Sequence, residues 1–132
     1  MPPFVDTHLH LLPGLDDGPA TMEAALEAAE VAIADGVVAV VATPHSNYQW
    51  PFQPDRVNQL RTEMQTLVGE RMRITTGCEL HLSYENVQAA LANPRAFTLN
   101  ASRYLLVEFP ELFDREAFAG VLDQLVGIGM VP

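Results

Sequence analysis

Histidine and acidic side chains follow four separate apolar segments of this sequence. Imidazole nitrogen together with carboxylate oxygen suits Mn, Fe or Zn, and a single cysteine excludes the thiolate clusters of structural zinc sites. One His-x-His pair or one glutamate after a strand is by itself more often chance than a ligand. The conjunction of all these groups favours a metal centre. The groups are Asp6-Thr7-His8-Leu9-His10, Thr43-Pro44-His45, Gly77-Cys78-Glu79 and Val107-Glu108.

Alternating strands and helices must position these groups. Side chains two apart on a strand point to the same face, so His8 and His10 can converge on one ion. In parallel α/β folds the active site lies at the carboxyl ends of the strands, where all the groups fall. The uniformly apolar run Val37–Ala42 is typical of a parallel strand covered on both faces. The predicted strands are Phe4–His8, Val37–Ala42, Arg73–Leu80 and Tyr104–Glu108.

Each predicted strand is followed by a predicted helix. Thr21 is expected to cap the first helix and Gly36 to follow its end, while Asp114 caps the last helix, which stops at Gly127 and Gly129. This alternation predicts an α/β fold with a parallel sheet. The other two helices are predicted over Asp55–Val68 and over Ser83–Leu91, the latter ending near Asn93-Pro94.

The chain length of 132 residues predicts a single domain. Four βα units make about half of a closed barrel, which takes around 250 residues. Met130-Val131-Pro132 has the character of a fifth strand that begins just before the sequence ends. We therefore expect residues 1–132 to form a partial barrel domain. The alternative is a complete, small open sheet of four strands.

The charge balance excludes several classes of partner. The chain has no lysine, and its 7 arginines face 17 acidic residues, so the net charge is -10. Nucleic-acid binding and anionic membrane surfaces both require the cations that this chain lacks. The longest apolar run is too short to span a bilayer and no leader peptide opens the sequence, so a cytoplasmic protein is expected. The acidity belongs either to a solvated surface or to a site for divalent cations.

The ordered motifs resemble those of a known family. The segment from Asp6 to His10, followed by Leu12-Pro13-Gly14-Leu15-Asp16-Asp17-Gly18, is similar to the opening of the PHP (polymerase and histidinol phosphatase) superfamily. Within this superfamily, the Asp-Asp-Gly loop is similar to that of one branch, the bacterial capsular-polysaccharide tyrosine phosphatases of the CpsB/YwqE type. Later blocks match in the same order: Ala42-Thr43-Pro44-His45, Gly77-Cys78-Glu79-Leu80 and Leu106-Val107-Glu108-Phe109-Pro110.

The resemblance implies the N-terminal half of a distorted (βα)7 barrel with three divalent ions, usually manganese, and with Fe or Zn as alternatives. His8 and His10 would hold the first ion, and Glu79 would bridge it to the second. Glu108 would complete the side of the second ion that this chain contains.

The third ion would be held by Asp17 and His45. Asp16 is expected to shape the turn while Asp17 faces the metal, although the sequence leaves the reverse open. Asp6 is expected to orient a histidine rather than to act as a ligand.

The implied activity is phosphotyrosine-protein dephosphorylation by metal-activated water, in regulation of capsular or exopolysaccharide synthesis. The implied substrate is a tyrosine-phosphorylated bacterial protein, specifically a tyrosine kinase of polysaccharide export. Family members continue into a His-Pro-Glu-Arg-like block and an Asp-x-His block that supply further ligands and phosphate-binding arginines, which are therefore expected downstream of Pro132. The alternatives are a PHP phosphoesterase acting on a small phosphate ester and a catalytically inactive metal-binding fragment.

Cysteine-based phosphatase chemistry does not fit this sequence. That chemistry needs an arginine six residues after the cysteine, but Tyr84 occupies this position after Cys78, and no glycine-rich cradle lies between them. Cys78 is therefore expected to be a small buried residue.

Four further residues lie near the predicted mouth of the site. Tyr48, Trp50 and Phe52 follow His45 and either contact a substrate tyrosine ring or pack as a hydrophobic lid. His81 is two residues after Glu79 and is expected to point to the same face of the strand. It therefore either contacts phosphate or lies at the rim of the site.

Overall fold

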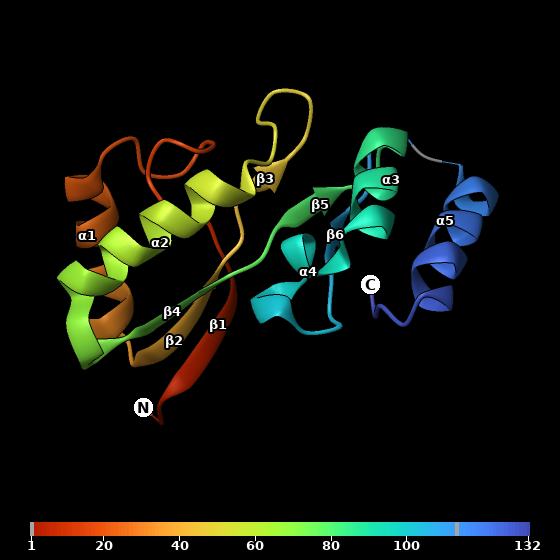
Figure 1. Cartoon of the computed structure of the whole chain (residues 1–132). Coiled ribbons are helices and arrows are strands. Elements are labelled where there is room, and N and C mark those ends of the chain that lie inside the picture. The colour runs from red at the N-terminus through yellow and green to blue at the C-terminus, as the bar shows by residue number, and fades with distance from the viewer. Residues whose placement is uncertain (1, 113) are drawn as a thin grey trace.

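The computed structural model describes residues 2–112 and 114–132. Parallel strands alternate with helices along this part of the chain (Figure 1), which confirms the predicted α/β class. The strands are β1 (Phe4–Leu9), β2 (Val37–Ala42), β3 (His45–Ser46), β4 (Arg73–Thr76), β5 (Glu79–His81) and β6 (Leu106–Glu108). The helices are α1 (Met22–Ala34), α2 (Pro54–Val68), α3 (Tyr84–Ala92), α4 (Pro94–Phe97) and α5 (Arg115–Gly127), with 3-10 turns η1 (Gly69–Arg71) and η2 (Leu99–Ala101).

The strands form two parallel three-stranded sheets, in the orders β1-β2-β4 and β3-β5-β6. The single strand predicted over Arg73–Leu80 is therefore wrong, because the structure divides it into β4 and β5. Pro44 supplies the physical reason, since it has no N–H to donate and interrupts the neighbouring strand between β2 and β3. Backbone hydrogen bonds continue the path on both sides of this break, from Gly77 N–H to the Ala42 carbonyl (2.9 Å) and from Glu79 N–H to the Pro44 carbonyl (3.0 Å).

Gly77 also lets the chain approach itself closely at the break. A Cβ at this position would lie 2.6 Å from the Leu99 side chain of η2 and 3.3 Å from the Val41 side chain of β2. Any larger residue would push η2 away from the sheet.

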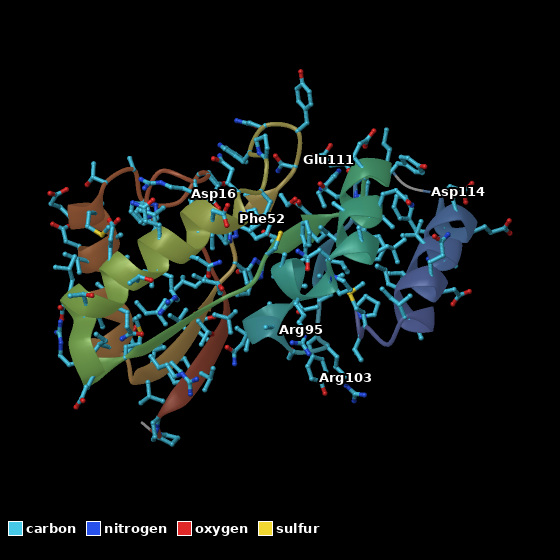
Figure 2. All side chains as sticks on the ribbon, viewed as in Figure 1. Asp16, Phe52, Arg95, Arg103, Glu111 and Asp114 are labelled. Atoms are coloured by element: carbon cyan, nitrogen blue, oxygen red, sulfur yellow. The ribbon has the colours of Figure 1, made fainter. Side chains whose placement is uncertain are left out.

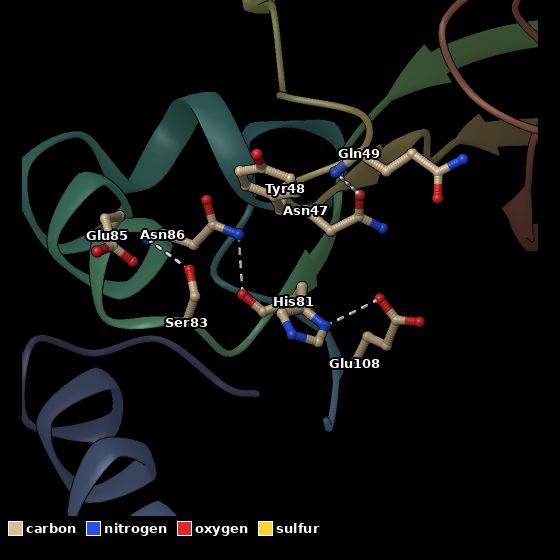
Figure 3. A pocket seen from close by; sticks show the side chains of 8 residues that line it. All are labelled: Asn47, Tyr48, Gln49, His81, Ser83, Glu85, Asn86 and Glu108. Atoms are coloured by element: carbon tan, nitrogen blue, oxygen red, sulfur yellow. Dashed lines mark hydrogen bonds and ion pairs between the residues drawn. The ribbon is translucent and has the colours of Figure 1, made fainter. Parts of the chain in front are cut away.

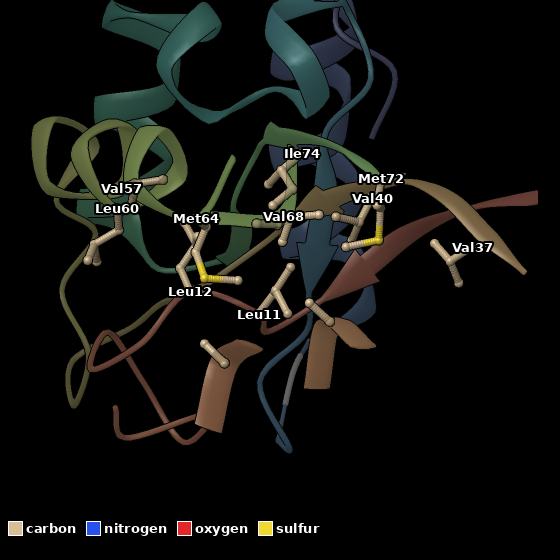
Figure 4. Close-up of a cluster of buried hydrophobic side chains, with 13 residues drawn as sticks. Leu11, Leu12, Val37, Val40, Val57, Leu60, Met64, Val68, Met72 and Ile74 are labelled. Atoms are coloured by element: carbon tan, nitrogen blue, oxygen red, sulfur yellow. The ribbon is translucent and has the colours of Figure 1, made fainter. Parts of the chain in front are cut away.

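Two hydrophobic cores lie side by side. Helices α1 and α2 cover one face of the β1-β2-β4 sheet, and their buried side chains make the first core (Figure 4). The second core contains buried side chains from β5, α3 and α5, and Cys78, Leu80 and Leu125 are fully buried in it. Phe52 (Figure 2) packs against both cores. Its ring contacts that of Phe97, with a centroid distance of 5.1 Å. This position confirms the packing interpretation for Phe52.

The prediction that the strand Val37–Ala42 is covered on both faces is wrong at one residue. The side chain of Val38 is 47% exposed, and Val5 of the neighbouring strand is 55% exposed. Helices α1 and α2 cover one face of this sheet (Figure 1), which leaves part of the other face open to solvent. The rest of β2 is largely buried, with Val40 and Ala42 inaccessible.

The predicted helix caps are present. Thr21 Oγ1 accepts a hydrogen bond from Ala24 N–H (3.3 Å), and Asp114 Oδ1 accepts one from Glu116 N–H (2.9 Å). Gly36 follows α1 with φ of +97°, a left-handed conformation that favours glycine. A further helix, α4, begins at Pro94, where the sequence predicted only an ending; proline is well tolerated at a first helical position.

The fourth predicted strand is shorter than expected, since β6 contains only Leu106–Glu108. Tyr104 instead makes an isolated parallel bridge to Val131, supported by a hydrogen bond from Leu105 N–H to the Val131 carbonyl (2.9 Å). Met130 beside it is 3% exposed. The fifth strand itself stays a prediction. Within residues 2–112 and 114–132, no helix combines the length and the apolar character needed to cross a membrane.

Candidate metal centre

The end of strand β1 brings two imidazoles to one carboxylate, since His8 lies in the strand and His10 directly follows it. His8 Nε2 lies 3.3 Å and His10 Nε2 lies 3.0 Å from Glu79 Oε2, and the two imidazole centroids are 5.5 Å apart. Side chains two apart on a strand share a face, so the convergence of this pair follows from its spacing. Glu79 is the first residue of β5, immediately after the break.

Strand β3 places a third imidazole beside the same carboxylate. His45 pairs in register with Glu79, and His45 Nδ1 lies 3.1 Å from Glu79 Oε2 and 3.7 Å from Glu108 Oε2. His45 Nε2 lies 3.5 Å from Asp17 Oδ1. Yet the buried Nδ1 atom of His45 makes no hydrogen bond, because neither carboxylate lies in hydrogen-bonding geometry. A lone pair surrounded by carboxylate oxygens that do not bond to it fits a ligand of a shared cation.

The structure therefore brings together the six side chains that the sequence predicted as ligands. They form three overlapping groups whose ligand atoms lie within 4.8 Å of one another. The groups are His8–His10–Glu79, His10–Asp17–His45 and His45–Glu79–Glu108.

Asp16 holds this arrangement together from beneath. Its side chain is 1% exposed. Asp16 Oδ1 accepts from Gly18 N–H (3.0 Å), which confirms its predicted role in shaping the turn. Asp16 Oδ2 accepts from His45 N–H (2.9 Å) and lies 3.0 Å from His10 Nδ1. Because Nδ1 of His10 is committed to Asp16, Nε2 is the atom that remains for a cation, and it faces Glu79.

Asp6 and Asp17 behave differently from Asp16. Asp6 Oδ1 accepts from His8 N–H (3.0 Å), so it fixes the backbone of that histidine. Asp17 is 59% exposed and lies 3.4 Å from His10 Nδ1. The sequence analysis did not predict that Asp16 contacts both His10 and His45. The position of the Asp-Asp-Gly turn between two groups of candidate ligands could have indicated it.

The electrostatics of the site follow from these contacts. The hydrogen bond with Asp16, together with the charges of Asp16 and Glu79, raises the pKa of His10 to about 9, against the opposing effect of burial. Burial disfavours the charged form of Asp16, but hydrogen bonds from His10, Gly18 and His45 hold its pKa below the ordinary value. A proton on His10 thus compensates the surrounding carboxylates, and a divalent cation would replace it.

A pocket of about 720 Å³ opens beside this centre (Figure 3). His81 lines this pocket, with Nδ1 3.4 Å from Glu108 Oε2. Tyr48 stands at the rim and is fully exposed. Trp50 does not line the pocket; its ring stacks on the His45 imidazole at 5.2 Å between centroids and 12° between planes. The pocket is lined by Asn47, Tyr48, Gln49, His81, Ser83, Glu85, Asn86 and Glu108.

Cys78 is buried, as the sequence predicted. Its side chain has no exposed surface, and burial raises the pKa of its thiol. A protonated, inaccessible thiol cannot serve as the nucleophile of a phosphatase.

The fold and these three groups define an α/β protein whose candidate metal ligands gather where parallel strands end. Residues 4–132 match the family model described as capsular polysaccharide synthesis, CpsB/CapC. The chain belongs to this family, which confirms the resemblance found in its sequence motifs.

Named relatives support the assignment. Tyrosine-protein phosphatase YwqE of Bacillus subtilis is 31% identical over 111 residues, which are 81% of this chain and 43% of YwqE. Tyrosine-protein phosphatase CpsB of Streptococcus pneumoniae is 26% identical over 133 residues, which are 98% of this chain and 54% of CpsB. Crystal structures of YwqE and CpsB, described as metal-dependent tyrosine phosphatases, include a chain that matches with a TM-score of 0.85 and 28% identity, over 98% of this chain and 53% of that chain. The chain thus spans about half the length of these relatives.

Proposed function

We propose that this chain forms the metal centre of a protein-tyrosine phosphatase that regulates capsular or exopolysaccharide synthesis. One observation carries the proposal, namely the three overlapping histidine and carboxylate groups at the strand ends. Relatives named as tyrosine-protein phosphatases support the reaction class. The proposed substrate is a tyrosine-phosphorylated bacterial protein, specifically a tyrosine kinase of polysaccharide export, and the proposed compartment is the cytoplasm.

The proposed cofactors are three Mn²⁺ ions, with Fe or Zn as alternatives, distributed over the ligands as the family resemblance implies. Mixed imidazole and carboxylate donors suit these metals, and the buried nitrogen of His45 without a hydrogen bond supports a cation there. The orienting roles of Asp16 and Asp6 support the positions of His10 and His8. The proposed ligands are His8, His10, Asp17, His45, Glu79 and Glu108.

The proposed chemistry needs no protein nucleophile. Bound divalent cations would neutralise phosphate oxygens and bring the pKa of water close to neutral. Asp16 keeps Nε2 of His10 directed toward Glu79. His81, which lies beside Glu108 and lines the pocket, is the proposed hydrogen-bond donor to phosphate. Tyr48 and Trp50 are the proposed contacts of the substrate ring, of which Tyr48 alone lines the pocket.

We propose that the two sheets are the first half of a distorted (βα)7 barrel and that residues 1–132 are a partial PHP domain. The parallel strands and the match to about half of a related chain support this arrangement. The phosphate-binding arginines are then expected in the second half, downstream of Pro132.

Phosphate release from phosphotyrosine peptides by the Mn²⁺-loaded, full-length gene product tests the proposal. We expect His10→Ala to lower kcat/KM at least about 100-fold, because it removes a ligand and its coupling to Asp16. Glu70→Gln, on the exposed surface of η1, is the matched control and should leave the rate unchanged. Failure of the loaded, full-length protein to release phosphate overturns the assignment.

Two alternatives have distinct outcomes. A faster turnover of small phosphate esters than of phosphopeptides indicates a different PHP phosphoesterase. Because the chain spans about half of its relatives, a catalytically inactive metal-binding fragment is the second alternative. Stoichiometric Mn²⁺ binding without turnover by residues 1–132 supports it.

A further inference from the structure

The pocket beside the metal centre is held in shape by its own polar side chains. Asn86 Nδ2 donates to the Ser46 carbonyl (2.6 Å) and to the His81 carbonyl (2.9 Å), so it joins β3 and β5 to the first turn of α3. Ser83 Oγ accepts from Asn86 N–H (3.2 Å) and caps the same helix. The walls of the pocket therefore exist before any ligand binds.

The rim opposite α3 is fixed in a similar way. Asn47 Oδ1 accepts from Gln49 N–H and from Trp50 N–H, both at 2.9 Å, and Asn47 N–H donates to the Trp50 carbonyl (3.0 Å). These bonds close the loop on which Tyr48 stands. The side-chain oxygen of Asn47 and the side-chain NH₂ group of Asn86 are thus used in building the pocket.

The charge of the pocket is uneven. Glu85 and Glu108 lie on opposite sides of it, with His81 between them (Figure 3). Glu108 belongs to a metal-ligand group, so its charge is compensated when a cation binds. Glu85 is exposed and makes no ion pair among the residues that the structure describes, and no arginine lines the pocket. The side of the pocket away from the metal centre therefore keeps one negative charge, at the first turn of α3, without an ion-pair partner among the described residues.

We propose that this pocket binds the polypeptide segment next to the phosphotyrosine and that Glu85 selects substrates with a lysine or arginine in that segment. The inference rests on the proposed phosphatase function, which places the phosphate at the Glu108 side. A volume of about 720 Å³ lies within the 300–1,000 Å³ range of ligand pockets and exceeds the needs of one aromatic ring. A substrate segment with an acidic residue beside the phosphotyrosine would be repelled by the Glu85 carboxylate and should bind less tightly.

Paired peptides measure this selectivity. The Mn²⁺-loaded, full-length gene product is titrated with two phosphotyrosine peptides that differ only in carrying lysine or glutamate beside the phosphotyrosine, and binding and hydrolysis are followed separately. An exposed ion pair contributes about 0.5–1 kcal/mol, so we expect about a 2- to 5-fold tighter Kd for the lysine peptide. Glu85→Gln should abolish this preference, and Glu85→Lys should invert it.

The control for overall charge is Glu70→Lys, which changes the net charge equally but lies in η1, outside the pocket. It should leave the ratio of the two Kd values unchanged. Equal Kd values for the two peptides, an unchanged ratio in Glu85→Lys, or no peptide binding overturns the inference. If the lysine peptide binds more tightly through Glu85 but neither peptide is hydrolysed, the inference stands and the phosphatase assignment fails. If both peptides are hydrolysed without a preference that depends on Glu85, the phosphatase assignment stands and the inference fails.

Discussion

Replacing Asp16 by asparagine removes one charge from beneath the metal centre while keeping the shape of the side chain. Both carboxylate oxygens are in use: Oδ1 accepts from Gly18 N–H, and Oδ2 accepts from His45 N–H and lies 3.0 Å from His10 Nδ1. An asparagine amide offers one oxygen and one NH₂ group. In either orientation its NH₂ group meets a backbone N–H, so at least one buried donor loses its acceptor.

The raised pKa of His10 sets an upper bound on the free energy of unfolding that Asp16→Asn loses with this contact. In the metal-free protein the pKa of His10 rises from 6.5 to about 9, which sets an upper limit on the stabilisation of roughly 3.4 kcal/mol well below pH 6.5 and of roughly 2.6 kcal/mol at pH 7. Solvent reaches part of the ring, so we reduce this figure to about 1–2 kcal/mol. The unpaired backbone donor adds about 1 kcal/mol. Asp16→Asn should therefore lower the free energy of unfolding by about 2–3 kcal/mol at pH 7.

The sign of the pH dependence is also fixed. A raised histidine pKa stabilises the folded state fully below pH 6.5, and this stabilisation is lost as the pH rises through about 9. Denaturant unfolding in EDTA, repeated between pH 6 and 9.5, measures both effects. The native protein should lose stability across this window, and Asp16→Asn should lose much less.

Asp17→Asn is the matched control, because it removes the same charge from a side chain that is 59% exposed. It should cost under about 0.5 kcal/mol in the metal-free protein. The reasoning is refuted if Asp16→Asn unfolds like the native protein at pH 7, or if the native protein shows no loss of stability between pH 6.5 and 9.

Other consequences can be measured in the same protein. Mn²⁺ binding requires neutral His10, so its affinity should rise up to about tenfold per pH unit between pH 7 and 8.5 in a chelator competition assay. Trp50→Leu removes the ring stacked on His45 and should weaken Mn²⁺ binding about 3- to 10-fold by calorimetry, whereas Trp50→Phe should retain most of it. Gly77→Val places a side chain against η2 and should lower the free energy of unfolding by about 1–3 kcal/mol in a denaturant titration. Cys78→Ala should leave phosphate release by the full-length protein within about twofold of native, since the thiol is buried.

The convergence of the ligands could be predicted because it needs only two local rules. Alternate residues of a strand share a face, and parallel strands end at the same edge. These rules predict that His8, His10, Glu79 and Glu108 lie close together, as they do in the structure. The helix caps were equally local, since each depends on one side chain and the next turn of backbone.

The unpredicted features depend on residues that are distant in sequence. The division of one strand into β4 and β5 is set by Pro44 in the neighbouring strand, more than 30 positions earlier. The stacking of Trp50 on His45 depends on how the loop between them closes. The choice of Asp16 over Asp17 as the buried partner depends on a turn whose direction the sequence left open.

The candidate ligands lie on chain segments that contribute to both hydrophobic cores. His8 and His10 adjoin Leu9, Leu11 and Leu12, which belong to the first core, whereas Glu79 and Glu108 adjoin residues of the second. A cation bound between them would therefore couple the two cores in folding. Without the cation, amide hydrogen exchange should show the second core opening at a lower free energy than the first. With the cation bound, exchange from both cores should slow and merge into one cooperative unfolding event, so metal availability would set the lifetime of the folded chain as well as its chemistry.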